Sequence, residues 1–146
     1  MADCTIVFAA DHAAFKLKKE LLNIAKLSNY DVLDVGTFDE YSVDYPDFGH
    51  QAAKVIQNGR ADFAIICCGT GIGIAIVANR HVGVRAAVCH NVETARLSRA
   101  HNDANVMALG SRVLGLDEAK DCMEIFLNTP FEGDRHLRRV KKIELI

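Results

Sequence analysis

Hydrophobic residues fall along the chain into short continuous runs, separated by longer segments with helical spacing. The short runs contain few polar residues, which is typical of strands buried on both faces of a sheet. They cover residues 4–10, 30–36, 61–69, 83–89 and 104–110. The longer segments repeat apolar residues every three or four positions with charged residues between them, which predicts amphipathic helices.

The predicted helices alternate with the strands along the whole chain. Pro46 lies near a helix start, Asn91 is a candidate N-terminal cap, and Pro130 ends a helix. The helices are expected over 13–27, 46–58, 72–80, 91–101 and 116–128, and a last one over 133–146 runs to the C-terminus. Such alternation with right-handed crossovers predicts a Rossmann-like, doubly wound α/β/α sandwich with a five-stranded parallel sheet. Residues 1–146 are expected to form a single domain.

Composition excludes several classes of protein. The net charge of −2 gives no sign of nucleic-acid or membrane binding, and the apolar runs are too short to span a bilayer. The N-terminus has no signal-peptide pattern, so the cytoplasm is the expected location. The five cysteines are odd in number and lack CxxC spacing, which indicates a reducing compartment and no structural metal.

Ligands of doubly wound folds bind outside the carboxyl ends of the strands, so the residues that follow each strand are the candidates. Asp11 and His12 follow the first predicted strand, and Arg112 follows the last. The loop CCGTGIG follows the third, and its glycines allow backbone N–H groups to approach a phosphate or a developing oxyanion. The loop is not a P-loop, because Gly-Lys-Ser/Thr does not follow it. It is also a poor dinucleotide-binding fingerprint, because Ile74 stands where the third glycine should be. A tight turn with glycines for packing is an equal alternative.

Cys67 and Cys68 are consecutive strand residues, so their side chains must point to opposite faces of the sheet. One thiol can face the ligand crevice and act as a base or nucleophile, while the other belongs to the core. The alternative for any single cysteine is a small buried hydrophobic residue. That alternative is expected to hold for Cys4, Cys89 and Cys122.

Two further polar segments stand out, each with a plain structural alternative. The segment 101–105, HNDAN, offers a histidine suited to proton transfer or is simply a polar loop. The segment 134–142 places Arg135 and Arg139 on one helix face, where they could clamp a phosphate or only be solvated. Together, a phosphorylated ligand, an acid–base pair and an oxyanion site point to proton transfer next to a carbonyl.

At this point the motifs resemble a known family along essentially the whole chain. ADH, SVDYPDF, CCGTGIGI, GVRAAVC, LSRAHNDANV, LGSRV and EGDRHLRRV occur in the order and spacing of ribose-5-phosphate isomerase type B. That family includes galactose-6-phosphate and allose-6-phosphate isomerases. The resemblance implies interconversion of ribose 5-phosphate and ribulose 5-phosphate through a cis-enediolate, without a cofactor or metal.

The resemblance also implies residue roles. Cys68 would be the base, since relatives that lack this cysteine use a glutamate where this chain has Ile74. Thr70 would relay hydroxyl protons and His101 would assist ring opening. Substrate would be bound by the remaining candidates: Asp11, His12, Tyr45, Gly69, Gly71, Gly73, Asn102, Arg112, Arg135 and Arg139, with Arg138 and His136 as less certain ligands.

The family pattern further implies a homodimer, or a pair of dimers, whose subunits share their active sites through HNDAN and the C-terminal arginines. Three alternatives remain open at this stage. They are a phosphohexose isomerase acting on allose or galactose 6-phosphate, a non-catalytic sugar-phosphate-binding protein, and a nucleotide-dependent oxidoreductase, which the broken glycine fingerprint disfavours.

Overall fold

The fold is a five-stranded parallel sheet between two layers of helices, as predicted. The computed structural model describes residues 3–145. The strand order is β2-β1-β3-β5-β4, and every pairing is parallel. The strands are β1 (Thr5–Ala10), β2 (Asp31–Asp34), β3 (Phe63–Cys68), β4 (Ala86–Val88) and β5 (Val106–Gly110).

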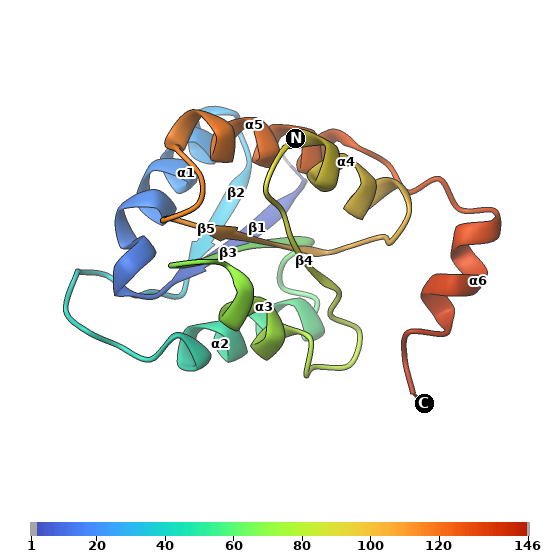
Figure 1. Cartoon of the computed structure of the whole chain (residues 1–146), viewed down its shortest axis with the longest axis horizontal. Helices are drawn as coiled ribbons and strands as arrows, with labels where there is room; N and C mark the ends of the chain where they lie inside the picture. The colour runs from blue at the N-terminus through green and yellow to red at the C-terminus, as the bar shows by residue number, and fades with distance from the viewer. Residues whose placement is uncertain (1–2, 146) are drawn as a thin grey trace.

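Helices α1, α4 and α5 cover one face of the sheet, and α2 and α3 cover the other (Figure 1). They are α1 (Phe15–Leu27), α2 (Tyr45–Gln57), α3 (Ile72–Ala78), α4 (Val92–Ala100) and α5 (Leu116–Asn128). Each face has its own apolar core, and the central strands contribute alternate residues to the two. None of the helices in the described part of the chain is long and apolar enough to cross a membrane.

Local sequence signals explain how several helices begin. Asn91 caps α4, because its side chain accepts the N–H of Thr94 at 2.8 Å and the threonine hydroxyl accepts back from Asn91. Asp11 caps a short 3₁₀ turn, η1 (His12–Ala14), that leads into α1. This turn replaces the start of the predicted helix, which becomes α-helical only at Phe15.

The C-terminal helix differs from the prediction. Helix α6 (Arg135–Lys141) ends five residues before the C-terminus, so the expected helix over 133–146 is wrong at that end. The N–H groups of Lys142 and Ile143 donate to the carbonyls three residues earlier, whereas an α-helix would bond four residues back. Leu145 is 99% exposed and has no apolar surface to pack against. Residue 146 lies outside the described residues. Helix α6 projects from the side of the sandwich (Figure 1), and its His136 and Val140 are buried.

Candidate active site

The residues after β1 are held by backbone contacts with neighbouring segments. Asp11 is buried and its Oδ1 accepts the N–H of Ala14 at 3.2 Å, so the capping role expected as an alternative is present. Nδ1 of His12 accepts the N–H of Val43 at 3.1 Å. A neutral imidazole that accepts at Nδ1 carries its proton on Nε2, so His12 can offer a hydrogen-bond donor to a ligand.

The loop after β3 wraps around the sulfur of Cys68. The N–H of Gly71 points at Cys68 Sγ from 3.1 Å, and an N–H donor in this position stabilises negative charge on sulfur. Gly71 has φ of +81°, a left-handed conformation that a side chain would strain. The N–H of Ile72 donates to Thr70 Oγ1 at 3.2 Å. Two of the backbone donors expected to bind an anion thus contact the proposed base and proton relay.

Two of the loop glycines contact candidate site residues directly. A Cβ on Gly73 would lie 2.7 Å from ring atoms of Tyr45, and one on Gly69 would lie 3.0 Å from the guanidinium of Arg112. The missing side chains therefore let Tyr45, at the start of α2, and Arg112, after β5, close on the loop. Ile74, where the alternative glutamate base would stand, is fully buried against α2.

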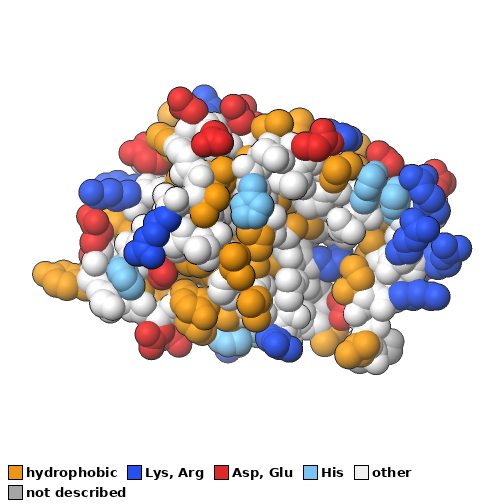
Figure 2. All heavy atoms as spheres, viewed as in Figure 1, with side chains coloured by type: hydrophobic (Ala, Val, Ile, Leu, Met, Phe, Trp, Pro, Cys, Tyr) orange, Lys and Arg blue, Asp and Glu red, His pale blue; other side chains and the backbone are white. Residues whose placement is uncertain are grey.

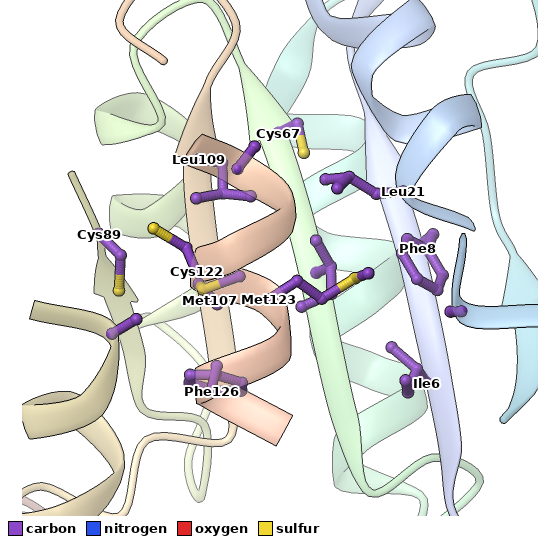
Figure 3. Close-up of a cluster of buried hydrophobic side chains, with 14 of the residues drawn as sticks. Ile6, Phe8, Leu21, Cys67, Cys89, Met107, Leu109, Cys122, Met123 and Phe126 are labelled. Carbon is purple, nitrogen blue, oxygen red and sulfur yellow. The ribbon is translucent and has the colours of Figure 1, made fainter. Parts of the chain in front are cut away.

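The two adjacent cysteines point to opposite faces, as strand alternation predicts. Cys67 lies in the core beneath α1 and α5 (Figure 3), whereas Cys68 belongs to the α2 and α3 side. Burial raises the pKa of the Cys67 thiol far above its ordinary value. Burial also raises the pKa of Cys89 to about 12 and that of Cys122 to about 11, which makes these thiols unreactive.

A second group of candidate residues gathers between the end of α4 and helix α6. A cavity of about 360 Å³ is lined by His101, Asn102, His136, Arg139, Val140 and Ile143. The rings of His101 and His136 stack with centroids 4.2 Å apart and planes 12° from parallel. Arg135, Arg138 and Arg139 are exposed, and basic side chains gather over α6 (Figure 2).

The loop that carries His101 and Asn102 is anchored through the next residue. Asp103 adopts φ of +48°, and its carboxylate accepts from Arg99 Nη1 at 2.9 Å. Nε of Arg85 donates to the Asp103 carbonyl at 2.9 Å. These two arginines hold a positive-φ conformation that is uncommon for residues other than glycine, although aspartate adopts it more often than most.

The structure places the candidate residues in two groups at opposite ends of the sheet. His101 and Asn102 precede β5, whereas Cys68 pairs with Gly110 at the end of β5. The four steps from Val106 to Gly110 span about 13 Å at roughly 3.3 Å per residue. One group, at the carboxyl edge, comprises Asp11, His12, Tyr45, Cys68, Gly69, Thr70, Gly71, Gly73 and Arg112. The other, at the amino edge, comprises His101, Asn102, Arg135 and Arg139.

Two side chains beside His101, those of Glu132 and His136, were not among the residues given a definite role from the sequence. Glu132 Oε1 lies 3.8 Å from Nε2 of His101 and 3.7 Å from Nε2 of His136. The i, i+4 spacing of Glu132 and His136 in EGDRH is the sequence signal that could have suggested this contact.

These three side chains are also the candidate metal ligands. An ion lies near the plane of each imidazole that binds it, and two nearly parallel rings stacked 4.2 Å apart cannot both meet that condition. The arrangement observed therefore does not fit a metal ion.

The fold defines a doubly wound α/β protein, with a glycine loop and a cysteine thiol at the carboxyl edge, where ligands of such folds bind. Residues 6–143 match the Ribose/Galactose Isomerase family, and the chain belongs to that family of isomerases. It is 43% identical to ribose-5-phosphate isomerase B of Escherichia coli over 141 residues, covering 97% of this chain and 95% of that one.

Solved structures agree with this assignment. Ribose-5-phosphate isomerase B from Clostridium thermocellum superposes with a TM-score of 0.94 at 49% identity, covering 95% of this chain and 94% of that one. The enzyme from Mycoplasma genitalium with bound ribulose-5-phosphate gives a TM-score of 0.93 at 39% identity, covering 98% and 95%.

Proposed function

We propose that the protein interconverts ribose 5-phosphate and ribulose 5-phosphate, with Cys68 as the base. The observation that carries the proposal is the N–H of Gly71 directed at Cys68 Sγ, inside a glycine loop that ends a central strand. Family membership and the ribulose-5-phosphate bound to the Mycoplasma relative support this choice of substrate.

In the proposed reaction, the Cys68 thiolate removes the proton from C2 of the open-chain aldose. The electron pair of that C–H bond forms the C1–C2 double bond, and the carbonyl oxygen at C1 takes up negative charge. The backbone N–H groups of the loop 69–73 that do not contact Cys68 or Thr70 stabilise this enediolate, and Thr70 relays a proton between the oxygens at C1 and C2. Cys68 then returns its proton to C1, which gives the ketose.

The remaining candidates bind and prepare the substrate. His12, Arg112, Arg135 and Arg139 hold the phosphate, and this remote binding energy orients the reacting carbons. Asp11 and Tyr45 contact the sugar. His101 assists opening of the furanose ring, and Asn102 binds sugar oxygens.

The site is shared between two subunits in this proposal. His101 and Asn102 lie at the opposite end of β5 from Cys68, so one chain does not bring them to the same substrate. A homodimer in which α6 and the loop 101–105 of one subunit complete the carboxyl-edge site of the other brings the two groups together. The exposed basic face of α6 is then a phosphate-binding element for the partner.

An isomerisation assay in deuterated water tests the function directly. Ribose 5-phosphate should be converted to ketose with solvent deuterium entering C1, and Cys68→Ala should abolish both conversion and exchange. A protein that binds the sugar phosphate without exchange would be a binder rather than an enzyme. Comparison of kcat/KM with allose 6-phosphate and galactose 6-phosphate separates pentose from hexose specificity, and a clear hexose preference would overturn the substrate assignment.

Subunit mixing tests the shared site. Cys68→Ala and His101→Ala are each expected to be inactive alone. When the two are unfolded and refolded together, about half of the dimers are mixed and each holds one intact site of two, so about a quarter of wild-type activity should return. No recovery in dimers shown to be mixed would place both groups of each site in one chain.

A further inference from the structure

Three ionisable side chains meet beside the amino-edge cavity. Glu132 Oε1 lies almost equally far from Nε2 of His101 and from Nε2 of His136, at 3.8 and 3.7 Å. The backbone N–H of Glu132 donates to the Ala100 carbonyl at 3.0 Å, which fixes this residue next to the end of α4. One carboxylate therefore faces two stacked imidazole rings.

Protonation of this cluster is disfavoured at His136. Imidazoles stacked with centroids 4.2 Å apart repel each other when both are charged, so protonation of both rings at once is disfavoured. Burial lowers the pKa of His136, and the positive charges of Arg135 and Arg139 on the same helix lower it further, against the opposing effect of Glu132. His101 is the more exposed of the two rings in one chain, with 37% of its side chain accessible against 8% for His136.

His136 has a further property that fits this assignment. Its Nε2 is buried and has no hydrogen-bond partner among the described residues, and its ring covers one face of His101. A neutral His136 therefore supports the His101 ring by stacking, while Glu132 supplies the negative charge.

We propose that Glu132 is a positioning residue for His101: its carboxylate keeps the proton on His101 and holds the ring against His136. The inference rests on the proposed ring-opening role of His101. In that step the C1–O4 bond of the furanose breaks with its electron pair on O4, which takes the proton from His101. The hydroxyl at C1 becomes the carbonyl and releases its proton to water.

The test compares Glu132→Gln with two matched variants. Glu132→Gln removes the charge but keeps the size of the side chain and the backbone bond to Ala100. Glu132→Asp keeps the charge, and Glu124→Gln removes an exposed carboxylate from α5. The pH profile of kcat/KM for ribose 5-phosphate is measured for each dimer and divided by that of the wild type, which cancels the titration of the substrate phosphate.

The ratio for Glu132→Gln should lie closest to one at pH 5.5, because the advantage that a nearby carboxylate gives to a protonated ring matters least in acid. It should fall to about one third to one tenth at pH 8, the loss expected for one half-exposed charge about 4 Å from the ring. Glu132→Asp should recover most of the activity at pH 8, and Glu124→Gln should give a flat ratio near one. A flat ratio for Glu132→Gln overturns the proposal.

A second measurement needs no enzymatic activity. Imidazole signals followed by NMR in the full-length protein should show that the first protonation of the histidine pair moves to lower pH in Glu132→Gln and stays in place in Glu124→Gln. If isomerisation itself is not observed, the proposed function fails while this titration still decides the role of Glu132. An unmoved titration in Glu132→Gln refutes that role.

Discussion

The two adjacent cysteines allow the same substitution to be made at neighbouring positions with opposite expected effects. Cys67→Ser should lower stability and leave kcat largely intact. Cys68→Ser should leave stability nearly unchanged and remove most of kcat. The contrast follows from the side of the sheet on which each sulfur lies.

The stability cost at Cys67 can be estimated from its surroundings. The side chain is fully buried in an apolar cluster that includes Ile65 and Leu109, so a serine hydroxyl there would be removed from water. A buried hydroxyl without a partner costs about 1–3 kcal/mol. At about 2–4 °C per kcal/mol for a chain of this size, the midpoint of thermal unfolding should fall by roughly 2–12 °C.

At Cys68 the loop offers the replacement a ready partner. The N–H of Gly71, now 3.1 Å from the sulfur, can donate to a serine oxygen, so the change in the free energy of unfolding should stay below about 1 kcal/mol. A hydroxyl is a far weaker base than a thiolate, and positioned acid–base groups contribute about 10²–10⁴-fold to rate. We therefore expect kcat to fall by at least about a hundredfold.

Both variants are assayed for ketose formation at saturating ribose 5-phosphate and for thermal unfolding by circular dichroism. The reasoning fails if Cys67→Ser is folded yet inactive, because that would make Cys67 the base. It also fails if Cys68→Ser retains kcat.

Three further predictions address binding, packing and pH. Arg139→Ala should raise KM by roughly 10–100-fold with a smaller effect on kcat, because one charged hydrogen bond to the phosphate is lost. The control variant Lys141→Ala should leave KM unchanged in the same kinetic assay. Gly73→Ala should displace the Tyr45 ring, which a Cβ would approach to 2.7 Å, and raise KM several-fold with little change in a melting curve. Burial lowers the pKa of His81, so below about pH 6.5 the unfolded chain binds more protons than the folded chain and stability falls as the pH is lowered. Urea titrations should show a smaller loss of stability in acid for His81→Gln than for the wild type.

The hydrophobic pattern was enough to predict the class of fold, because strands buried on both faces read as continuous apolar runs. It could not predict the order of the strands. β5 inserts between β3 and β4, and nothing in the runs 83–89 and 104–110 distinguishes a central strand from an edge strand. The end of α6 was also missed, since the apolar residues Ile143 and Leu145 continue the helical pattern although both are exposed.

Part of the candidate site could also be predicted from the sequence. Asp11, the loop 69–73 and Arg112 follow strands directly, and the carboxyl ends of parallel strands meet at one edge. The contact of Tyr45 with Gly73 and the bond from Val43 to His12 depend on how the 37–44 segment folds back over the sheet, which no local pattern encodes. Glu132 was missed for a similar reason, because its partner His101 lies 31 positions earlier in the chain.

The polarity of the strands is what makes the proposed site an intermolecular one. In a parallel sheet, a residue that follows its strand lies at the carboxyl edge and a residue that precedes its strand lies at the amino edge. Cys68 follows β3 and His101 precedes β5, and the register of these two strands is fixed by continuous pairing from Ala64 with Val106 to Cys68 with Gly110. Loop movements within one chain cannot cancel a separation of about 13 Å set by paired strands. If both residues act on one sugar phosphate, a second copy of the chain must therefore supply one of them, and dissociation of the dimer should abolish turnover without unfolding either subunit.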